Sequence, residues 1–279
     1  VKFLLSLHKG PIFSLKWSPT GARLLSGSYD KTTIVWDAST GSKVRQFEVH
    51  EAPALDVDWR GEDVFASCGT DKTVAVCRVP AADAMSDGAP PVAAVRYVGH
   101  SDEVNAVSFD PSGTLLASCS DDCTAKVWGF DADLPASKDT LSVSTPKWTF
   151  AAHSKEVYTI RWSPTGPGSA NPSKPLLLAT ASFDNDVRLW AASDGTCVHR
   201  LSRHTDPVYS VSFSPSAGRI ASGSLAGKLY VWDVDTGKVS ASYTGKGDIF
   251  EVGFDATERR VAACFSSSIV SIVDVGDQP

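Results

Sequence analysis

Residues 100–128 read HSDEVNAVSFDPSGTLLASCSDDCTAKVW, and this stretch decides the fold because its pattern recurs along the chain. It begins with His100, continues as an alternating apolar run over 104–109, and turns at 110–113. A second run leads to a turn containing Asp, and a third run ends at Trp128. Alternation with a period of two, enrichment in Val, Ile, Thr and Trp, and Pro-Gly turns predict strands joined by hairpins.

Five copies of the pattern carry its histidine, and a sixth has Gly245 in its place. The histidines are His8, His50, His100, His153 and His204. The alternating runs that follow are 12–17, 55–59, 104–109, 157–162 and 208–213, with 249–254 in the sixth copy. Repetition at a period of forty to fifty residues predicts one small sheet per repeat. Pro/Ser-rich segments at 80–95 and 131–146 are expected as exposed, mobile loops between repeats, and 166–175 as a long loop inside the fourth.

The repeated order of His, Ser or Thr, Asp and Trp resembles the WD-repeat pattern. That resemblance implies an all-β protein, a β-propeller with one four-stranded blade per repeat. We expect a single WD-repeat β-propeller domain over residues 1–279 with six four-stranded blades. An N-terminal strand within Val1–Leu7 would pair beside 269–273 and close the last blade, so that neither strand edge stays unpaired. The alternative is a fragment of an eight-bladed propeller.

Composition excludes several classes of protein. The 279 residues carry 26 basic and 32 acidic side chains, and this net charge of −6 has the wrong sign for bulk electrostatic binding of nucleic acid. No apolar run reaches the length of about 20 residues that crosses a bilayer, and 1–7 is too short for a signal-peptide core. The six cysteines form no CxxC pair, which is typical of free thiols in a reducing, intracellular compartment.

Each repeat offers a hydroxyl, an imidazole and a carboxylate, which are the ingredients of nucleophilic catalysis. Three sets are complete and end in Trp: His8/Ser26/Asp30/Trp36, His100/Ser118/Asp122/Trp128 and His153/Thr180/Asp184/Trp190. An enzyme needs one pre-organised site and not a copy per repeat, so we interpret these tetrads as buried hydrogen-bond chains that hold each sheet together. The second repeat has Cys77 for Trp and the fifth has Ala226 for Asp. The sixth has lost all four, with Gly245, Ala263, Ser267 and Val273 in their places.

No cofactor or metal is expected. Cys119, Cys123 and His100 have no common zinc-ligand spacing. The segment 244–247, Thr-Gly-Lys-Gly, lacks the spacing of a phosphate-binding loop. The sequence therefore predicts a protein that is not an enzyme.

A partner-binding face is predicted from residues that the repeat does not require. Five residues after each histidine position, or just before each turn Asp, stand Phe13, Tyr29, Asn105, Asp121, Tyr158, Phe183, Tyr209 and Phe250. These positions lie at the entry to the innermost strand, near one rim of a propeller. Aromatic side chains are favoured at interaction hot spots. The alternative is that several of them pack between neighbouring blades.

Several sequence segments contain residues that the repeat pattern does not require, and these segments resemble the transducin β-like family. They are HKGPIFSLKW (8–17), DKTTIVWDA (30–38), PALDVDW (53–59), LLASCSDD (115–122), EVYTIRWSPTGPG (156–168) and IFEV (249–252). The resemblance implies a nuclear scaffold subunit of a transcriptional corepressor complex that contains a histone deacetylase. Its partners would be proteins or peptides, histone tails among the candidates, with no direct nucleic acid and no membrane. The alternative is a substrate receptor or adaptor for ubiquitin ligase machinery. The family's amino-terminal LisH-type region and first repeats have no counterpart in residues 1–279.

Overall fold

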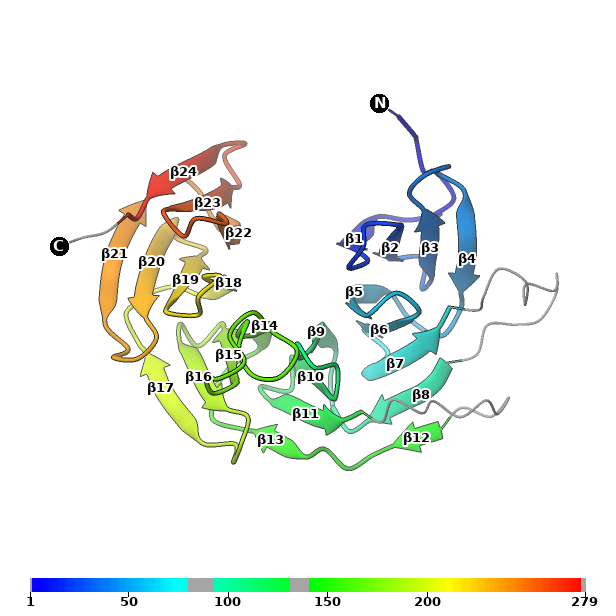
Figure 1. The fold of residues 1–279 in the computed structure, drawn as a ribbon, viewed down its shortest axis with the longest axis horizontal. Coiled ribbons are helices and arrows are strands. Elements are labelled where there is room, and N and C mark those ends of the chain that lie inside the picture. The colour runs from blue at the N-terminus through cyan, green and yellow to red at the C-terminus, as the bar shows by residue number, and fades with distance from the viewer. Residues whose placement is uncertain (1, 80–92, 131–140, 277–279) are drawn as a thin grey trace. The chain divides into compact units, whose positions relative to one another are not determined.

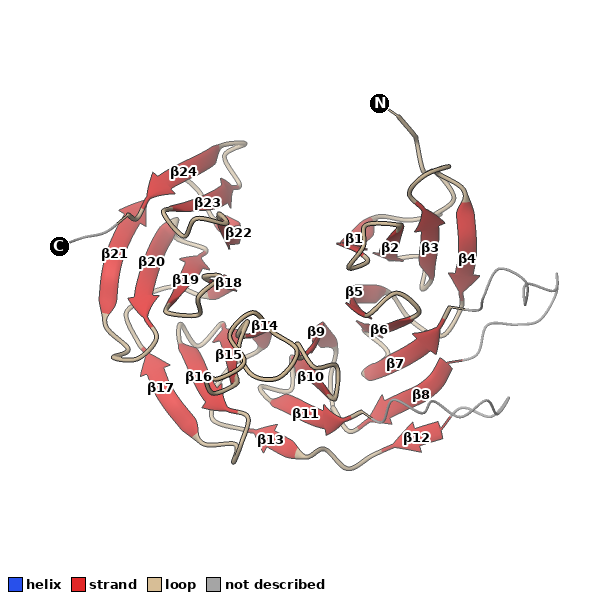
Figure 2. Ribbon diagram, in the orientation of Figure 1, coloured by secondary structure: helices blue, strands red, loops and turns tan. Residues whose placement is uncertain are grey.

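The computed structural model describes residues 2–79, 93–130 and 141–276. Across these ranges every regular element is a β-strand (Figure 2). The parts of the predicted loops at 80–92 and 131–140 lie outside the described residues. None of the described residues belongs to a helix with the length and hydropathy needed to cross a membrane.

The contacts within the chain divide it into two compact units. Unit 1 comprises Val1–Phe109, Gly113–Asp122 and Lys126–Lys147, and unit 2 comprises Asp110–Ser112, Cys123–Ala125 and Trp148–Pro279. The strand order of each unit can be followed in Figure 1.

Unit 1 contains antiparallel sheets whose consecutive strands are neighbours. The first sheet is β1 (Ile12–Trp17), β2 (Arg23–Ser28), β3 (Thr33–Asp37) and β4 (Lys43–Phe47). The second contains β5 (Ala54–Arg60), β6 (Val64–Gly69), β7 (Thr73–Arg78) and β8 (Ala93–Val98), and β12 (Leu141–Val143) lies parallel to β8. The strands β9 (Val104–Phe109), β10 (Leu115–Ser120) and β11 (Ala125–Gly129) follow the same order.

Unit 2 begins with β13 (Trp148–Phe150) and repeats the same arrangement. One sheet is β14 (Val157–Trp162), β15 (Leu177–Ser182), β16 (Val187–Ala191) and β17 (Cys197–Leu201). The next is β18 (Val208–Phe213), β19 (Arg219–Ser224), β20 (Lys228–Asp233) and β21 (Val239–Thr244). The last is β22 (Ile249–Phe254), β23 (Arg260–Phe265) and β24 (Val270–Asp274).

Strand register gives every sheet two distinct edges. In β14 and β15, Val157 pairs with Ser182 at one end and Trp162 with Leu178 at the other. The first end carries the histidine and the Asp turn, and we call it the tetrad edge. The second end carries the connection between the first two strands of the sheet, and we call it the hairpin edge.

The predicted N-terminal closing strand is wrong. Residues 2–7 contain no strand, and β22–β24 remains a three-stranded sheet among the described residues. Phe3 lies instead over the turn between β3 and β4, where a Cβ on Gly41 would come within 2.5 Å of its ring. Because Gly41 has no side chain, the turn leaves room for the Phe3 ring to pack on the first sheet.

The predicted loops also contribute strands. β8 begins at Ala93, inside the segment expected as a loop over 80–95. β12 comes from the segment 131–146, and its Leu141–Val143 pair with Val95–Tyr97. The second sheet therefore has five strands rather than four.

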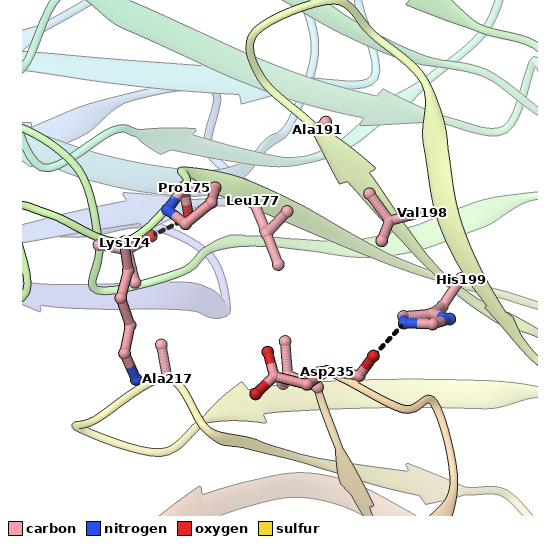
Figure 3. A pocket seen from close by; sticks show the side chains of 10 residues that line it. Lys174, Pro175, Leu177, Ala191, Val198, His199, Ala217 and Asp235 are labelled. Atoms are coloured by element: carbon pink, nitrogen blue, oxygen red, sulfur yellow. Dashed lines mark hydrogen bonds between the residues drawn. The ribbon is translucent and has the colours of Figure 1, made fainter.

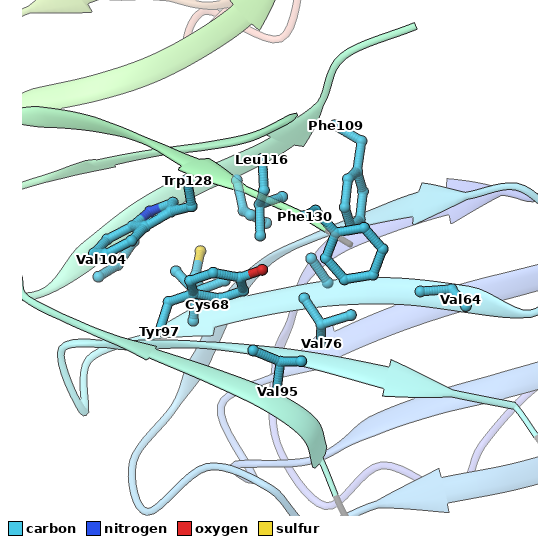
Figure 4. Packing of buried hydrophobic residues seen from close by; sticks show 13 residues of the cluster. Val64, Cys68, Val76, Val95, Tyr97, Val104, Phe109, Leu116, Trp128 and Phe130 are labelled. Atoms are coloured by element: carbon cyan, nitrogen blue, oxygen red, sulfur yellow. The ribbon is translucent and has the colours of Figure 1, made fainter. Parts of the chain in front are cut away.

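The core lies between consecutive sheets. In unit 1 the side chains of β6, β7 and β8 meet those of β9, β10 and β11, with Trp128 fully buried among them (Figure 4). β1 is different, because Trp17 is 62% exposed whereas its equivalent in β5, Trp59, is 8% exposed. One apolar face of β1 is therefore exposed to solvent.

Candidate functional site

The tetrads form closed hydrogen-bond chains. In the fourth repeat Trp190 Nε1–H donates to Thr180 Oγ1 at 2.9 Å, and His153 Nε2 lies 2.8 Å from the same oxygen. His153 Nδ1 lies 2.9 Å from Asp184 Oδ2. Since the carboxylate accepts only, the His153 Nδ1 carries a proton and donates it to Asp184.

The other complete tetrads have the same geometry. His8 contacts Ser26 and Asp30 at 2.7 and 2.9 Å, and Trp36 donates to Ser26 at 2.9 Å. His100 contacts Ser118 and Asp122 at 2.9 and 2.8 Å, and Trp128 donates to Ser118 at 2.9 Å. In the second repeat His50 keeps Ser67 and Asp71 at 2.7 and 2.9 Å, although Cys77 replaces the Trp.

The carboxylates of Asp30 and Asp71 are ionised and also hold the loop backbone. Burial raises the pKa of Asp71, but the hydrogen bond and charge of His50 and the Glu51 N–H outweigh it and bring this pKa to about 2. Asp30 has a pKa of about 2 for similar reasons, since burial is outweighed by the Lys9 N–H and the Thr32 hydroxyl. Each carboxylate therefore ties its turn to the segment that carries the histidine.

This geometry argues against nucleophilic chemistry at the tetrads. Ser26, Ser118 and Thr180 are 1%, 0% and 0% exposed, so a substrate carbonyl cannot reach their hydroxyls. Each hydroxyl already accepts from an indole N–H and faces an imidazole nitrogen. The arrangement is one that stabilises a sheet. Among the residues that the structure describes, no group of three His, Cys, Asp or Glu side chains could hold a metal ion.

The fifth repeat has an incomplete tetrad with a visible consequence. His204 Nε2 contacts Ser222 Oγ at 2.7 Å, and Trp232 donates to the same oxygen at 2.8 Å. His204 Nδ1 is buried without a hydrogen-bond partner in the described part of the chain. Burial lowers the pKa of His204 to about 4, against the opposing charge of Asp206.

The turn of that repeat keeps its shape although Ala226 replaces the Asp. Leu225 N–H donates to Pro207 O at 3.0 Å, as Phe183 N–H donates to Glu156 O at 2.9 Å in the fourth repeat. Gly227 has a φ of +71°, close to the +74° of its equivalent Asn185. The turns have the same backbone shape, so the imidazole of His204 is unpaired because residue 226 has no carboxylate.

Four of the predicted face residues meet in unit 2, and we call them the aromatic cluster: Tyr158, Phe183, Tyr209 and Phe250. Tyr158 stacks on Phe183 with ring centroids 5.5 Å apart, and its ring lies 4.2 Å from that of Tyr209. Phe250 meets Tyr209 edge-to-face at 5.4 Å. The Tyr209 hydroxyl donates to the Tyr158 hydroxyl at 2.7 Å, and burial raises the pKa of Tyr209.

The remaining face residues form two separate contacts in unit 1. Phe13 and Tyr29 meet edge-to-face at 6.4 Å, and both are more than half exposed. Asn105 Nδ2 donates to Asp121 Oδ1 at 2.6 Å. The eight predicted face residues therefore form one aromatic cluster of four and two separate pairs, and all of them lie at tetrad edges.

Sequence reasoning missed a set of contacts that join neighbouring inner strands. Ser14 Oγ donates to Asp56 Oδ1 at 2.7 Å, and the Val107 N–H donates to Asp56 Oδ2 at 3.2 Å. Asp58 Oδ2 accepts from the Phe109 N–H at 2.8 Å. The signal available in the sequence was two acidic residues at alternating positions of an otherwise apolar strand.

Small antiparallel sheets, five of which carry a His–Ser/Thr–Asp–Trp chain or an incomplete form of it, define a WD-repeat protein of the β-propeller class. The chain belongs to the WD40 family: its model, described as WD domain, G-beta repeat, matches residues 2–37, 93–129, 144–191 and 195–233. The unmatched parts include the second repeat, which lacks the Trp, and the sixth, which lacks all four tetrad residues.

Individual relatives confirm the resemblance to the transducin β-like family. The F-box-like/WD repeat-containing protein TBL1X of Mus musculus is 47% identical over 97% of this chain and 48% of its own length. The WD40 repeat-containing protein HOS15 of Arabidopsis thaliana is 46% identical over 97% of this chain and 41% of its own. The Transcriptional corepressor LEUNIG_HOMOLOG of Arabidopsis thaliana is 29% identical over 75% of this chain and 23% of its own. The chain spans about half the length, or less, of these curated relatives.

Proposed function

We propose that this chain is a non-catalytic protein-interaction scaffold of a nuclear transcriptional corepressor complex that contains a histone deacetylase. The similarity to transducin β-like relatives over 97% of the chain supports the class of complex, and the name of a more distant relative includes the words transcriptional corepressor. The scaffold role is supported by the tetrads, whose hydroxyls are buried and already hydrogen-bonded.

The observation that carries the proposed binding role is the aromatic cluster. The rings of Tyr158, Phe183 and Tyr209 are partly buried against one another, and Phe250 is 42% exposed at the margin. Aromatic side chains fixed by their neighbours offer a large contact area and lose little conformational entropy on binding. We place a protein or peptide partner here, histone tails among the candidates.

The pair of tyrosine hydroxyls leaves one hydrogen-bond donor on the aromatic cluster. Because Tyr209 donates its proton to the Tyr158 oxygen, the proton of Tyr158 is the donor that remains. Tyr158 donates this proton in no hydrogen bond found among the described residues. A peptide carbonyl or carboxylate lying on the rings would accept this hydrogen bond.

Affinity purification from nuclear extract, with partners identified by mass spectrometry, tests the proposal. The full-length protein that contains this chain is compared with Tyr209→Ala and Phe250→Ala, and Tyr243→Ala serves as an aromatic control on an outer strand. We expect the parent and the control to retain deacetylase subunits. Tyr209→Ala should weaken this binding by about 2 kcal/mol without a loss of fold.

Two outcomes would redirect the proposal. Recovery of ubiquitin ligase subunits in place of a deacetylase would favour the second candidate, a ligase substrate receptor or adaptor, which the words F-box-like in the name of the mouse relative keep open. Unchanged binding by folded cluster variants would place the partner on another surface of the protein.

A further inference from the structure

A second candidate site lies at the hairpin edge of unit 2, away from the tetrads and the aromatic cluster. A cavity of about 240 Å³ opens there between the sheets β14–β17 and β18–β21 (Figure 3). Its volume is below the range of about 300–1,000 Å³ typical of sites for drug-sized ligands. It has the size for one side chain of a partner.

One wall of this cavity is the segment 166–175, which is expected from the sequence as an exposed, mobile loop. In the structure this segment is held by hydrogen bonds. Asn171 Nδ2 donates to Pro164 O and Pro215 O at 2.8 and 2.9 Å. The Lys174 ammonium donates to Ser216 O at 2.8 Å. The wall is therefore anchored both to its own sheet and to the neighbouring turn.

The lining of the cavity combines an apolar surface with a carboxylate. Leu177, Val198 and Val234 provide aliphatic side chains, and Ala191 and Ala217 leave room between them. Figure 3 shows the carboxylate of Asp235 directed toward the open space beside Leu177.

The two charged groups of the lining are not equivalent. The Lys174 ammonium is held by the Ser216 carbonyl at 2.8 Å, although it keeps its positive charge. The Asp235 carboxylate has no hydrogen-bond or ion-pair partner in the ranges that the structure describes, and its backbone carbonyl is fixed by His199 Nε2 at 3.1 Å. The charged group of the lining that is left without a protein partner among the described residues is therefore the Asp235 carboxylate.

We propose that this cavity accepts the side chain of a lysine from a partner protein. The methylene stem would lie on Leu177, Val198 and Val234, and the ammonium would meet the carboxylate of Asp235. Lysine side chains bury their stems along apolar surfaces while the charged end stays at the water boundary, which matches an apolar wall with a carboxylate at its opening. Acetylation of that lysine removes its charge, so the site distinguishes the free amine from its acetylated form.

The experiment uses n-butylammonium as the probe, because it reproduces the lysine side chain without a peptide. The full chain is labelled at its Leu and Val methyl groups, and NMR follows Leu177, Val198 and Val234 during titration. n-Butanol and N-butylacetamide are the uncharged comparators. We expect saturable shifts at these methyls with n-butylammonium and at least threefold weaker binding of both comparators.

Variants separate the carboxylate from the general charge of the protein. Asp235→Asn should weaken n-butylammonium binding about three- to fivefold, which is the upper part of the range expected of an exposed ion pair. Asp248→Asn makes the same charge change at the tetrad edge and should leave binding unchanged. Lys174→Met should preserve or strengthen it. If Asp235→Asn does not fold, Asp235→Ser replaces it.

Each of several results would overturn the proposal. Absence of methyl shifts up to the solubility limit of the probe would mean that the cavity does not take this side chain. Equal binding of n-butanol would show an apolar site that does not recognise the cation. Equal weakening by Asp235→Asn and Asp248→Asn, or loss of binding in Lys174→Met, would contradict recognition by Asp235.

Discussion

His204 Nδ1 is left without a hydrogen bond because Ala226 stands where the other histidine-bearing repeats place the carboxylate that pairs with this nitrogen. In the neighbouring repeat Asp184 accepts from His153 Nδ1 at 2.9 Å across a turn of the same shape. A buried polar group without a partner costs about 1–3 kcal/mol. The fifth repeat therefore folds with a defect that one substitution can repair.

Ala226→Asp should raise the free energy of unfolding by about 1 kcal/mol or more at neutral pH, because it completes the tetrad. Ala226→Asn is the matched control, since it supplies an acceptor without a charge and should stabilise less. Chemical denaturation and melting temperature measure both effects. A destabilised Ala226→Asp variant would mean that the side chain at 226 does not reach the imidazole.

The same histidine makes stability depend on pH. Burial lowers the pKa of His204 from 6.5 to about 4, so between these values the unfolded chain binds a proton that the folded chain does not. The stability from the neutral imidazole is present above about pH 6.5 and is lost as pH falls toward 4. We expect Ala226→Asp to reduce this loss, as measured by denaturation across that range. If Ala226→Asp leaves the pH dependence of stability unchanged, the loss of stability at acid pH comes from another group.

Removing a histidine should cost most where its tetrad is complete. His100→Ala removes contacts to Ser118 and Asp122 and should lower stability by about 1–3 kcal/mol. His204→Ala removes one such contact together with the unpaired nitrogen and should cost less. Asp122→Ala should resemble His100→Ala. Variants that melted like the parent while losing partner binding would identify the tetrads as binding residues instead.

Cysteine reactivity should follow burial. Burial raises the pKa of Cys77 to about 12 and that of Cys68 well above its usual range, whereas Cys197 is exposed on β17. Iodoacetamide at mildly alkaline pH should label Cys197 first, and Cys68 and Cys77 only after denaturation, because the thiolate is the reactive form. Peptide mass spectrometry reads out the order, with Cys197→Ser as the control. Early labelling of Cys77 would show that the second sheet opens in the folded state.

Deleting residues 1–7 should have a small effect on stability. Phe3 contacts Gly41 but is 38% exposed, Leu4 is 85% exposed, and residues 2–7 add no strand. We expect the melting temperature to fall by no more than a few degrees, measured beside Phe3→Ala. A large fall or aggregation would restore the strand-closure hypothesis that the structure contradicts.

The sequence by itself determined the strands and the tetrads. The alternating runs predicted at 12–17, 104–109, 157–162, 208–213 and 249–254 coincide with β1, β9, β14, β18 and β22. This succeeds because alternation, turn residues and the spacing of His, Ser or Thr, Asp and Trp are local properties that recur in each copy. The missing Asp at 226 was likewise readable as a departure from the repeat.

Only the tertiary structure decided which distant residues meet. The contact of Tyr209 with Tyr158, the seat of Phe3 over Gly41, the parallel pairing of β12 with β8 and the cavity beside Asp235 join segments that lie far apart in the chain. Periodicity shows which face of a strand a side chain is on, but not which neighbouring element covers that face. Each of these contacts depends on the packing and spacing of separate elements, such as the room left by a glycine or a small side chain, and a single repeat does not encode them.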